Sequence, residues 1–178
     1  MGERGIGHAF DIDHEIQRVL ATGFARDDSA ALEAELATGR RRVLYILDNA
    51  GEIVFDRLLI EELAAHDVIA CVRGGPIIND VTLDDSEQVG LTKIVPVITT
   101  GSDAVGIEWS EASPEFRQAF AAADLVIAKG PANFETLADS PGNVYFILKA
   151  KCPCVAQELG VMLGQVVIVH KPAGQSCG

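Results

Sequence analysis

The chain has 178 residues, a length typical of a single domain that can bury a substantial core. Its 48% hydrophobic and 22% charged residues indicate a compact globular protein and exclude a disordered one. The net charge of -12 disfavours nucleic acids and anionic membranes as partners. No apolar stretch of about 18 residues and no amino-terminal apolar run occurs, so we expect neither a membrane span nor a signal peptide, and a cytoplasmic location.

The first 40 residues form a predicted helical segment, which precedes a predicted α/β domain over residues 41–178. Either Asp11 or Asp13 can cap a short amphipathic helix. Asp28 and Ser29 stand at the start of a second predicted helix, which Gly39 ends.

From residue 42 onward, apolar runs typical of strands alternate with patterns typical of helices. Strands are predicted near residues 42–47, 68–72, 94–98, 125–128, 144–148 and 166–169. Thr82 can form a capping box with Asp85, and Ser113 precedes a proline at a first helical position. Pro96 indicates that the third strand lies at an edge or contains a bulge. The alternation predicts a three-layer α/β/α sandwich with a mostly parallel, Rossmann-like sheet.

The stretch from Leu47 to Glu52 joins the first strand to the helical pattern that follows it. Asp48 and Asn49 come directly after the buried strand, and ligands of open α/β sheets bind outside the carboxyl ends of strands. Alternatively, Asn49 caps the helix and Glu52 completes a capping box. Capping accounts for neither Asp48 nor Gly51, so we favour a functional site here.

Polar side chains follow the other strands as well, and a parallel sheet brings all of them to one edge. They are Asp48, Asn49, Asn79, Asp80, Lys129, Asn133 and Lys149. Carboxylate and amide oxygens suit Mg²⁺ or Mn²⁺, and two lysines on an acidic protein provide charge for a phosphate group. A single lysine is more often a solvated side chain. The joint placement of these groups predicts metal-assisted phosphoryl transfer or hydrolysis.

Other chemistries lack their motifs. The sequence contains no Rossmann glycine fingerprint, no Walker A motif and no nucleophile elbow. Asp48 is a poor candidate for a phospho-accepting nucleophile, because Ala50 stands where a second aspartate is needed. The cysteines are predicted to be reduced, structural thiols, since one pair is spaced more closely than zinc-binding pairs usually are. They are Cys71, Cys152, Cys154 and Cys177.

Four segments, which occur in the same order along the chain, resemble segments of a known family. They are Leu47–Asp56 (LDNAGEIVFD), Arg73–Thr82 (RGGPIINDVT), Ala128–Glu135 (AKGPANFE) and Ile147–Pro153 (ILKAKCP). Together they resemble the metal-dependent damage-control phosphatases, formerly classed as a domain of unknown function. The resemblance is greatest to the stand-alone archaeal and bacterial branch, and it extends from about Phe10 to the last strand.

The resemblance implies a phosphatase that uses a divalent metal ion (Mg²⁺, Mn²⁺, Co²⁺ or Ni²⁺). Its implied substrates are small phosphorylated metabolites, such as sugar phosphates, phosphopantetheine-like compounds or damaged metabolites. The metal ligands that it implies are Asp48, Asn49 and Asp80. The substrate contacts that we expect are Asn79, Lys129, Asn133 and Lys149. The catalytic groups that we expect are Asp48, Glu52 and Asp103, the last two supporting the ligands or positioning the attacking water.

Two features differ from the family pattern. Family members usually carry a further helical amino-terminal portion, so residues 1–40 would be the remnant of a larger helical part. A short form or fragment with an open site would fit this, and so would a homo-oligomer in which a second subunit closes the site. Ala132 stands where relatives often have glycine, which would alter the substrate loop.

Two other functions stay open at this point. One is carboxyl methyl transfer from S-adenosylmethionine, which binding of that cofactor without metal would support. The other is a metal- or metabolite-binding module without turnover, which tight metal binding without phosphate release would support.

Overall fold

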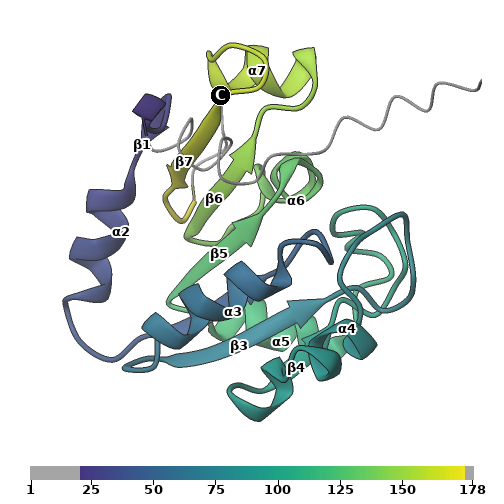
Figure 1. Cartoon of the computed structure of the whole chain (residues 1–178). Helices are drawn as coiled ribbons and strands as arrows, with labels where there is room; N and C mark the ends of the chain where they lie inside the picture. The colour runs from purple at the N-terminus through teal and green to yellow at the C-terminus, as the bar shows by residue number, and fades with distance from the viewer. Residues whose placement is uncertain (1–20, 175–178) are drawn as a thin grey trace, which may run out of the picture.

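The computed structural model describes residues 21–174, and its centre is a seven-stranded sheet in the order β1-β7-β6-β5-β2-β3-β4 (Figure 1). The strands are β1 (Arg26–Asp27), β2 (Arg42–Ile46), β3 (Asp67–Val72), β4 (Val97–Thr99), β5 (Leu125–Lys129), β6 (Val144–Lys149) and β7 (Val166–Lys171). Every neighbouring pair is parallel except β6 and β7, which are antiparallel. The predicted α/β class with a mostly parallel sheet is therefore confirmed.

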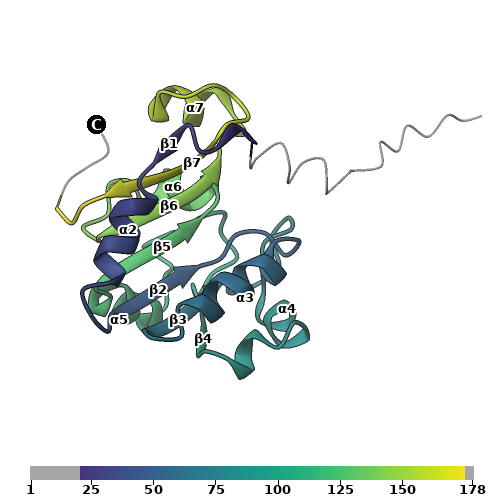
Figure 2. The same cartoon turned by 60° about the vertical axis from the view of Figure 1, so that its left-hand side comes forward.

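Helices cover both faces of this sheet, as the views in Figures 1 and 2 show. They are α2 (Ser29–Leu36), α3 (Ile53–Glu62), α4 (Leu83–Gln88), α5 (Pro114–Ala122), α6 (Pro131–Leu137) and α7 (Pro153–Leu159), with a 3₁₀ turn η1 (Leu91–Lys93). Side chains of α5, α6 and α7 pack in one apolar cluster, and those of α2 and α3 pack in the other. Because side chains alternate along a strand, β2 supplies Leu44 to the first cluster and Tyr45 to the second.

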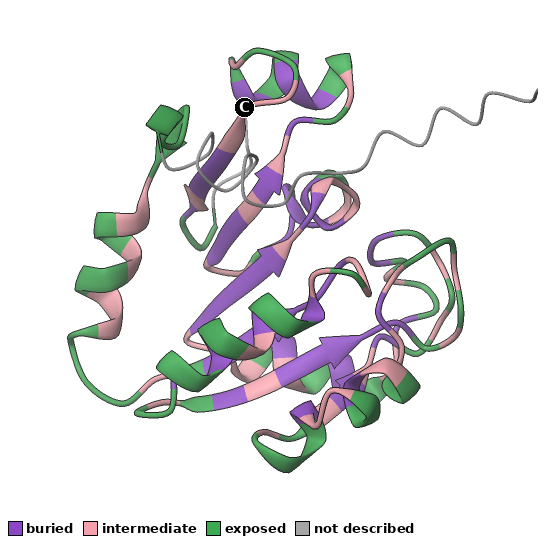
Figure 3. Cartoon of the chain, viewed as in Figure 1, coloured by how far each residue is buried: buried purple, intermediate pink, exposed green. Residues whose placement is uncertain are grey.

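The central strands are buried on both faces (Figure 3). Residues 43–47 along β2 are no more than 2% exposed. This burial explains why the sequence of β2 is a continuous apolar run and does not alternate with polar residues.

The path of the chain changes direction at β2. From β2 the chain moves outward through β3 to β4, and it then returns to place β5 on the other side of β2. The carboxyl ends of β2 and β5 therefore flank a topological switch point, which is where open α/β sheets bind ligands.

The predicted helix starts are confirmed. Thr82 and Asp85 form the capping box of α4, with the Asp85 carboxylate accepting from the Thr82 backbone at 2.8 Å. The Ser113 hydroxyl accepts from the Phe116 backbone at 3.0 Å and caps α5. Phe116 and Phe120 point into the core, as their spacing predicts.

One predicted strand boundary differs from the structure, and so does the alternative in which Asn49 caps a helix. The third strand is predicted near residues 94–98, but β4 begins at Val97, because the η1 turn and Pro96 delay its start. Its predicted edge position is confirmed. Asn49 does not cap α3: its side chain accepts from the Gly51 backbone at 2.8 Å, and the residue before the helix is Glu52.

The amino-terminal region contributes more than a helix. β1 extends the sheet by pairing in parallel with β7, an addition that the sequence did not predict. The second predicted helix is present as α2, and Glu35 ties it to the sheet by accepting from Asn143 and Tyr145. The first predicted helix, together with Cys177, lies outside the described residues, and the boundary at residue 40 stays a prediction.

The described cysteines, Cys71, Cys152 and Cys154, are free thiols, in agreement with the sequence analysis. Within residues 21–174, the structure contains no helix with the length and apolarity that crossing a membrane requires.

Candidate functional site at the sheet edge

Asp48 stands at the switch point, directly beyond the end of β2. It is 9% exposed, and its carboxylate accepts no hydrogen bond from any described residue. Burial raises the pKa of this carboxyl group, and the negative charge of Asp80 raises it further, to about 6. Among the described residues, the positive charges of Arg73 and Lys151 offset these effects on the pKa only in part, and no donor hydrogen-bonds to the carboxylate.

Backbone hydrogen bonds bring two distant segments together around this carboxylate. Asn49 and Asp80 form an antiparallel bridge, in which the Ala50 amide donates to the Asn79 oxygen at 2.8 Å. The Val81 amide donates to the Asp48 backbone oxygen at 2.9 Å. The three predicted metal ligands, Asp48, Asn49 and Asp80, are thus neighbours in the fold.

Gly130 directly follows β5, and its lack of a side chain lets the backbone there lie against the Asp48 carboxylate. It has a φ of 82°, and a Cβ atom placed on it would lie 2.1 Å from the Asp48 Oδ2 atom. Only glycine combines this conformation with this contact. The glycine after Lys129 thus allows the β5 loop to lie against the carboxylate.

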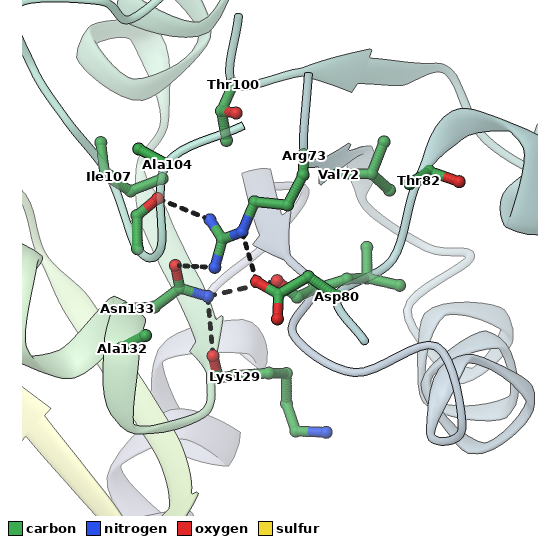
Figure 4. A network of polar contacts seen from close by, with 12 residues as sticks. Val72, Arg73, Asp80, Thr82, Thr100, Ala104, Ile107, Lys129, Ala132 and Asn133 are labelled. Carbon is green, nitrogen blue, oxygen red and sulfur yellow. Dashed lines mark hydrogen bonds and ion pairs between the residues drawn. The ribbon is translucent and has the colours of Figure 1, made fainter. Parts of the chain in front are cut away.

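Arg73 links three loops of the site (Figure 4). Its buried guanidinium donates to the Asp80 carboxylate at 2.6 Å, to the Gly106 oxygen at 2.8 Å and to the Asn133 side-chain oxygen at 3.0 Å. The sequence analysis included Arg73 in a family segment but did not identify it as a site residue. An arginine directly after a buried strand of an acidic protein was the available signal.

Asn133 is fully buried, and protein groups use both ends of its amide. Its nitrogen donates to the Lys129 backbone oxygen at 2.7 Å and to the Leu47 oxygen at 3.2 Å, while its oxygen accepts from Arg73. Asn133 therefore braces the ends of β2 and β5, and its expected contact with substrate stays a prediction.

The Lys129 ammonium lies between two carboxylates, one from Glu52 just before α3 and one from Asp56 in its first turn. It donates to Asp56 at 2.7 Å and to Glu52 at 3.1 Å, and the Tyr45 hydroxyl donates to the same Asp56 oxygen at 2.7 Å. Burial lowers the pKa of Lys129, but the two carboxylates outweigh burial and raise it overall. Asp56 and Tyr45 were not predicted, although Asp56 occupies an inward position between Ile53 and Ile60.

Four other polar groups lie at the end of β6 or in the segments that follow β3, β4 and β6. Asn79 and Asp103 are exposed, and Asn79 follows Ile78, whose positive φ of 50° is strained for a β-branched residue. Lys149, at the end of β6, lines a cavity of about 480 Å³. The positive charge of Lys151 acts on Asp48 and lowers its pKa, so this lysine also belongs to the neighbourhood of the site.

The donor set suits a hard divalent cation. Within residues 21–174, no cluster of three or more His, Cys, Asp or Glu side chains could hold a metal. A metal bound to the predicted ligands would therefore have two carboxylates and one amide oxygen around it. Asp48 and Asp80 repel each other, and the Asp48 carboxylate accepts no hydrogen bond from the described chain. A cation between them would relieve both costs, and oxygen donors favour Mg²⁺ or Mn²⁺ over metals that prefer thiolates.

The fold and the switch-point site are those of a doubly wound α/β protein with a polar ligand site. A family model described as the damage-control phosphatase ARMT1-like domain matches residues 5–167, and the chain belongs to this family.

Two relatives are described as damage-control phosphatases. Damage-control phosphatase PH1575 of Pyrococcus horikoshii is 43% identical over 164 residues, which are 90% of this chain and 57% of that protein. A damage-control phosphatase of Archaeoglobus fulgidus is 40% identical over 156 residues, which are 85% of this chain and 53% of that protein. The chain thus spans about half the length of these curated relatives.

The crystal structure of a DUF89 family protein, PH1575 from Pyrococcus horikoshii, has the same fold. It superposes with a TM-score of 0.83 at 42% sequence identity, over 90% of this chain and 57% of that one.

Proposed function

We propose that the chain is a divalent-metal-dependent phosphatase that hydrolyses small phosphate esters, such as sugar phosphates or damaged phosphometabolites. The observation that carries this proposal is the buried Asp48 carboxylate at the switch point, without a hydrogen-bond donor among the described residues and beside Asp80. The names of the relatives support the class of reaction.

Each group has a proposed task in this reaction. Asp48, Asn49 and Asp80 would hold the cation, which supplies Lewis-acid stabilisation of the charge on the phosphoryl oxygens. Lys129 and Lys149 would bind the phosphate group, with Asn79 at the rim and Asn133 bracing the two strand ends. Glu52 or Asp103 would orient the attacking water.

The test is phosphate release from p-nitrophenyl phosphate and a panel of sugar phosphates, in EDTA and with added Mg²⁺, Mn²⁺, Co²⁺ or Ni²⁺. We expect hydrolysis only with metal, and we expect Asp48→Ala to abolish it. The matched control is Asp139→Ala, which removes an exposed carboxylate outside the site.

Two results would contradict the proposal. One is the absence of release with every metal, from protein that is folded and binds metal. The other is release that Asp48→Ala leaves at the level of the Asp139→Ala control.

A further inference from the structure

The two carboxylates that pair with Lys129 occupy different environments. The Asp56 side chain is 2% exposed, whereas the Glu52 side chain is 46% exposed. Both come from the amino-terminal part of α3, so one ammonium group faces two negative charges. An anion that binds to Lys129 comes close to both carboxylates, and the departure of one of them relieves the repulsion between like charges.

Asp56 is fixed in place. One carboxylate oxygen accepts from both Lys129 and the Tyr45 hydroxyl, and the other oxygen is buried with no hydrogen-bond partner among residues 21–174. A buried carboxylate that lost its cation would be strongly destabilised. The inward position on α3 prevents Asp56 from turning toward solvent.

Glu52 is free to leave. It lies just before the first residue of α3, its contact with Lys129 is the longer of the two at 3.1 Å, and no other side-chain hydrogen bond of Glu52 occurs among the described residues. Rotation of this half-exposed side chain would return its charge to water at little cost.

We propose that Asp56, held by Tyr45, is the permanent partner of the Lys129 ammonium, and that Glu52 is a temporary partner that the phosphate group of a ligand replaces. This inference rests on the proposed function, because it requires an anion site at Lys129. In this proposal, Asp56 and Tyr45 position the Lys129 ammonium, and the Lys129–Glu52 contact weakens the binding of phosphate.

If phosphate replaces Glu52 at Lys129, the affinity for phosphate should increase when Glu52 loses its charge. In Glu52→Gln the amide no longer competes for Lys129 and no longer repels the anion, so inorganic phosphate should bind about three- to tenfold more tightly. Isothermal titration with inorganic phosphate measures this directly. Glu62→Gln, an exposed position at the other end of α3, is the control and should leave the affinity unchanged.

The permanent pairing is tested in the free protein by NMR of ¹⁵N-labelled lysine ammonium groups, with Lys129→Arg used to assign the signal. We expect a slowly exchanging Lys129 ammonium signal in the wild type and in Glu52→Gln. The signal should be lost in Asp56→Asn and weakened in Tyr45→Phe, which keeps the ring and removes only the hydroxyl. If Asp56→Asn does not fold, Tyr45→Phe decides.

Several outcomes would overturn the inference. Equal or weaker phosphate binding by Glu52→Gln would mean that Glu52 is no obstacle, and a signal that depends on Glu52 but not on Asp56 or Tyr45 would reverse the two roles. If neither the wild type nor Glu52→Gln binds phosphate, the replacement fails. If the binding and NMR results are as expected but no phosphate ester is hydrolysed, only the proposed function fails.

Discussion

Asp48 and Gly130 lie so close together that their identities depend on each other. A methyl group at residue 130 would overlap the carboxylate, and the φ of 82° would strain any other residue. The lysine-glycine pair at the end of β5 therefore serves two purposes at adjacent positions, since Lys129 carries charge and Gly130 makes room for Asp48.

The first prediction concerns Gly130→Ala. We expect two contributions to its destabilisation: about 1 kcal/mol from the positive φ and about 1 to 3 kcal/mol from the overlap with Asp48. Gly160→Ala is the control, because its φ is 65° and its Cβ would meet nothing within 4 Å. Denaturant unfolding of both variants measures the two losses. Because Gly130 has a ψ of 162° and Gly160 has a ψ of 32°, the excess loss in Gly130→Ala reports the overlap together with the added backbone strain, and equal losses would contradict the contact.

The second prediction concerns the charge of Asp48 in metal-free protein. Its folded-state pKa of about 6 exceeds the usual value of an aspartate, so the folded state holds this proton more tightly than the unfolded state does. The contribution of Asp48 to stability is therefore complete below about pH 4 and is lost as the pH rises through about 6.

The variant Asp48→Asn has no carboxylate at this position, so it should not lose this stability as the pH rises. At pH 7 in EDTA, we expect the variant to be more stable than the wild type by about 1 to 2 kcal/mol, with the difference vanishing near pH 4. Unfolding in urea at several pH values measures it. A variant that is less stable at pH 7, or a difference that does not depend on pH, would show that the carboxylate is satisfied in the folded protein.

At the scale of elements, Arg73 joins parts of the chain that the sheet alone does not connect. It ties the end of β3 to Asp80, to the loop at Gly106 and to α6 through Asn133. These contacts fix the loops of the site relative to one another.

The third prediction is that Arg73→Met destabilises the protein by about 3 kcal/mol or more, because it leaves Asp80 and Asn133 buried without their partner. Arg40→Met is the control: it breaks the ion pair with Asp67, whose side chains are 69% and 53% exposed, and its effect should be small by comparison. Similar midpoints of urea unfolding for the two variants would contradict a structural role for Arg73.

The strand ends and helix caps could be predicted because their signals are local. Asp48 follows an apolar run, and Thr82 with Asp85 forms a pattern of four residues. Tyr45 and Asp56 could not be predicted as partners of Lys129, because that contact depends on the pairing of β2 with β5 and on the rotation of α3. The two-residue β1 was missed because a strand this short has no periodicity.

At the scale of the whole molecule, the order of the strands explains why residues so far apart meet. β2, β3 and β5 contribute their carboxyl ends to one edge because these strands are parallel. The change in the direction of the chain at β2 places the loops after β2 and β5 on either side of the switch point. This edge gathers carboxylates, whose mutual repulsion the described protein relieves only in part, through Arg73 and Lys129.

The fourth prediction follows from this incomplete compensation. A ligand that binds only the folded state raises its stability, so Mn²⁺ or Mg²⁺ at a hundredfold excess over the dissociation constant should add about 2.7 kcal/mol. Thermal unfolding with increasing metal measures the gain, and EDTA should reverse it. Asp48→Asn should lose most of the gain while Asp139→Ala keeps it. Equal stabilisation of these two variants would place the bound metal elsewhere on the acidic surface, because the charge that attracts it would then not be that of Asp48.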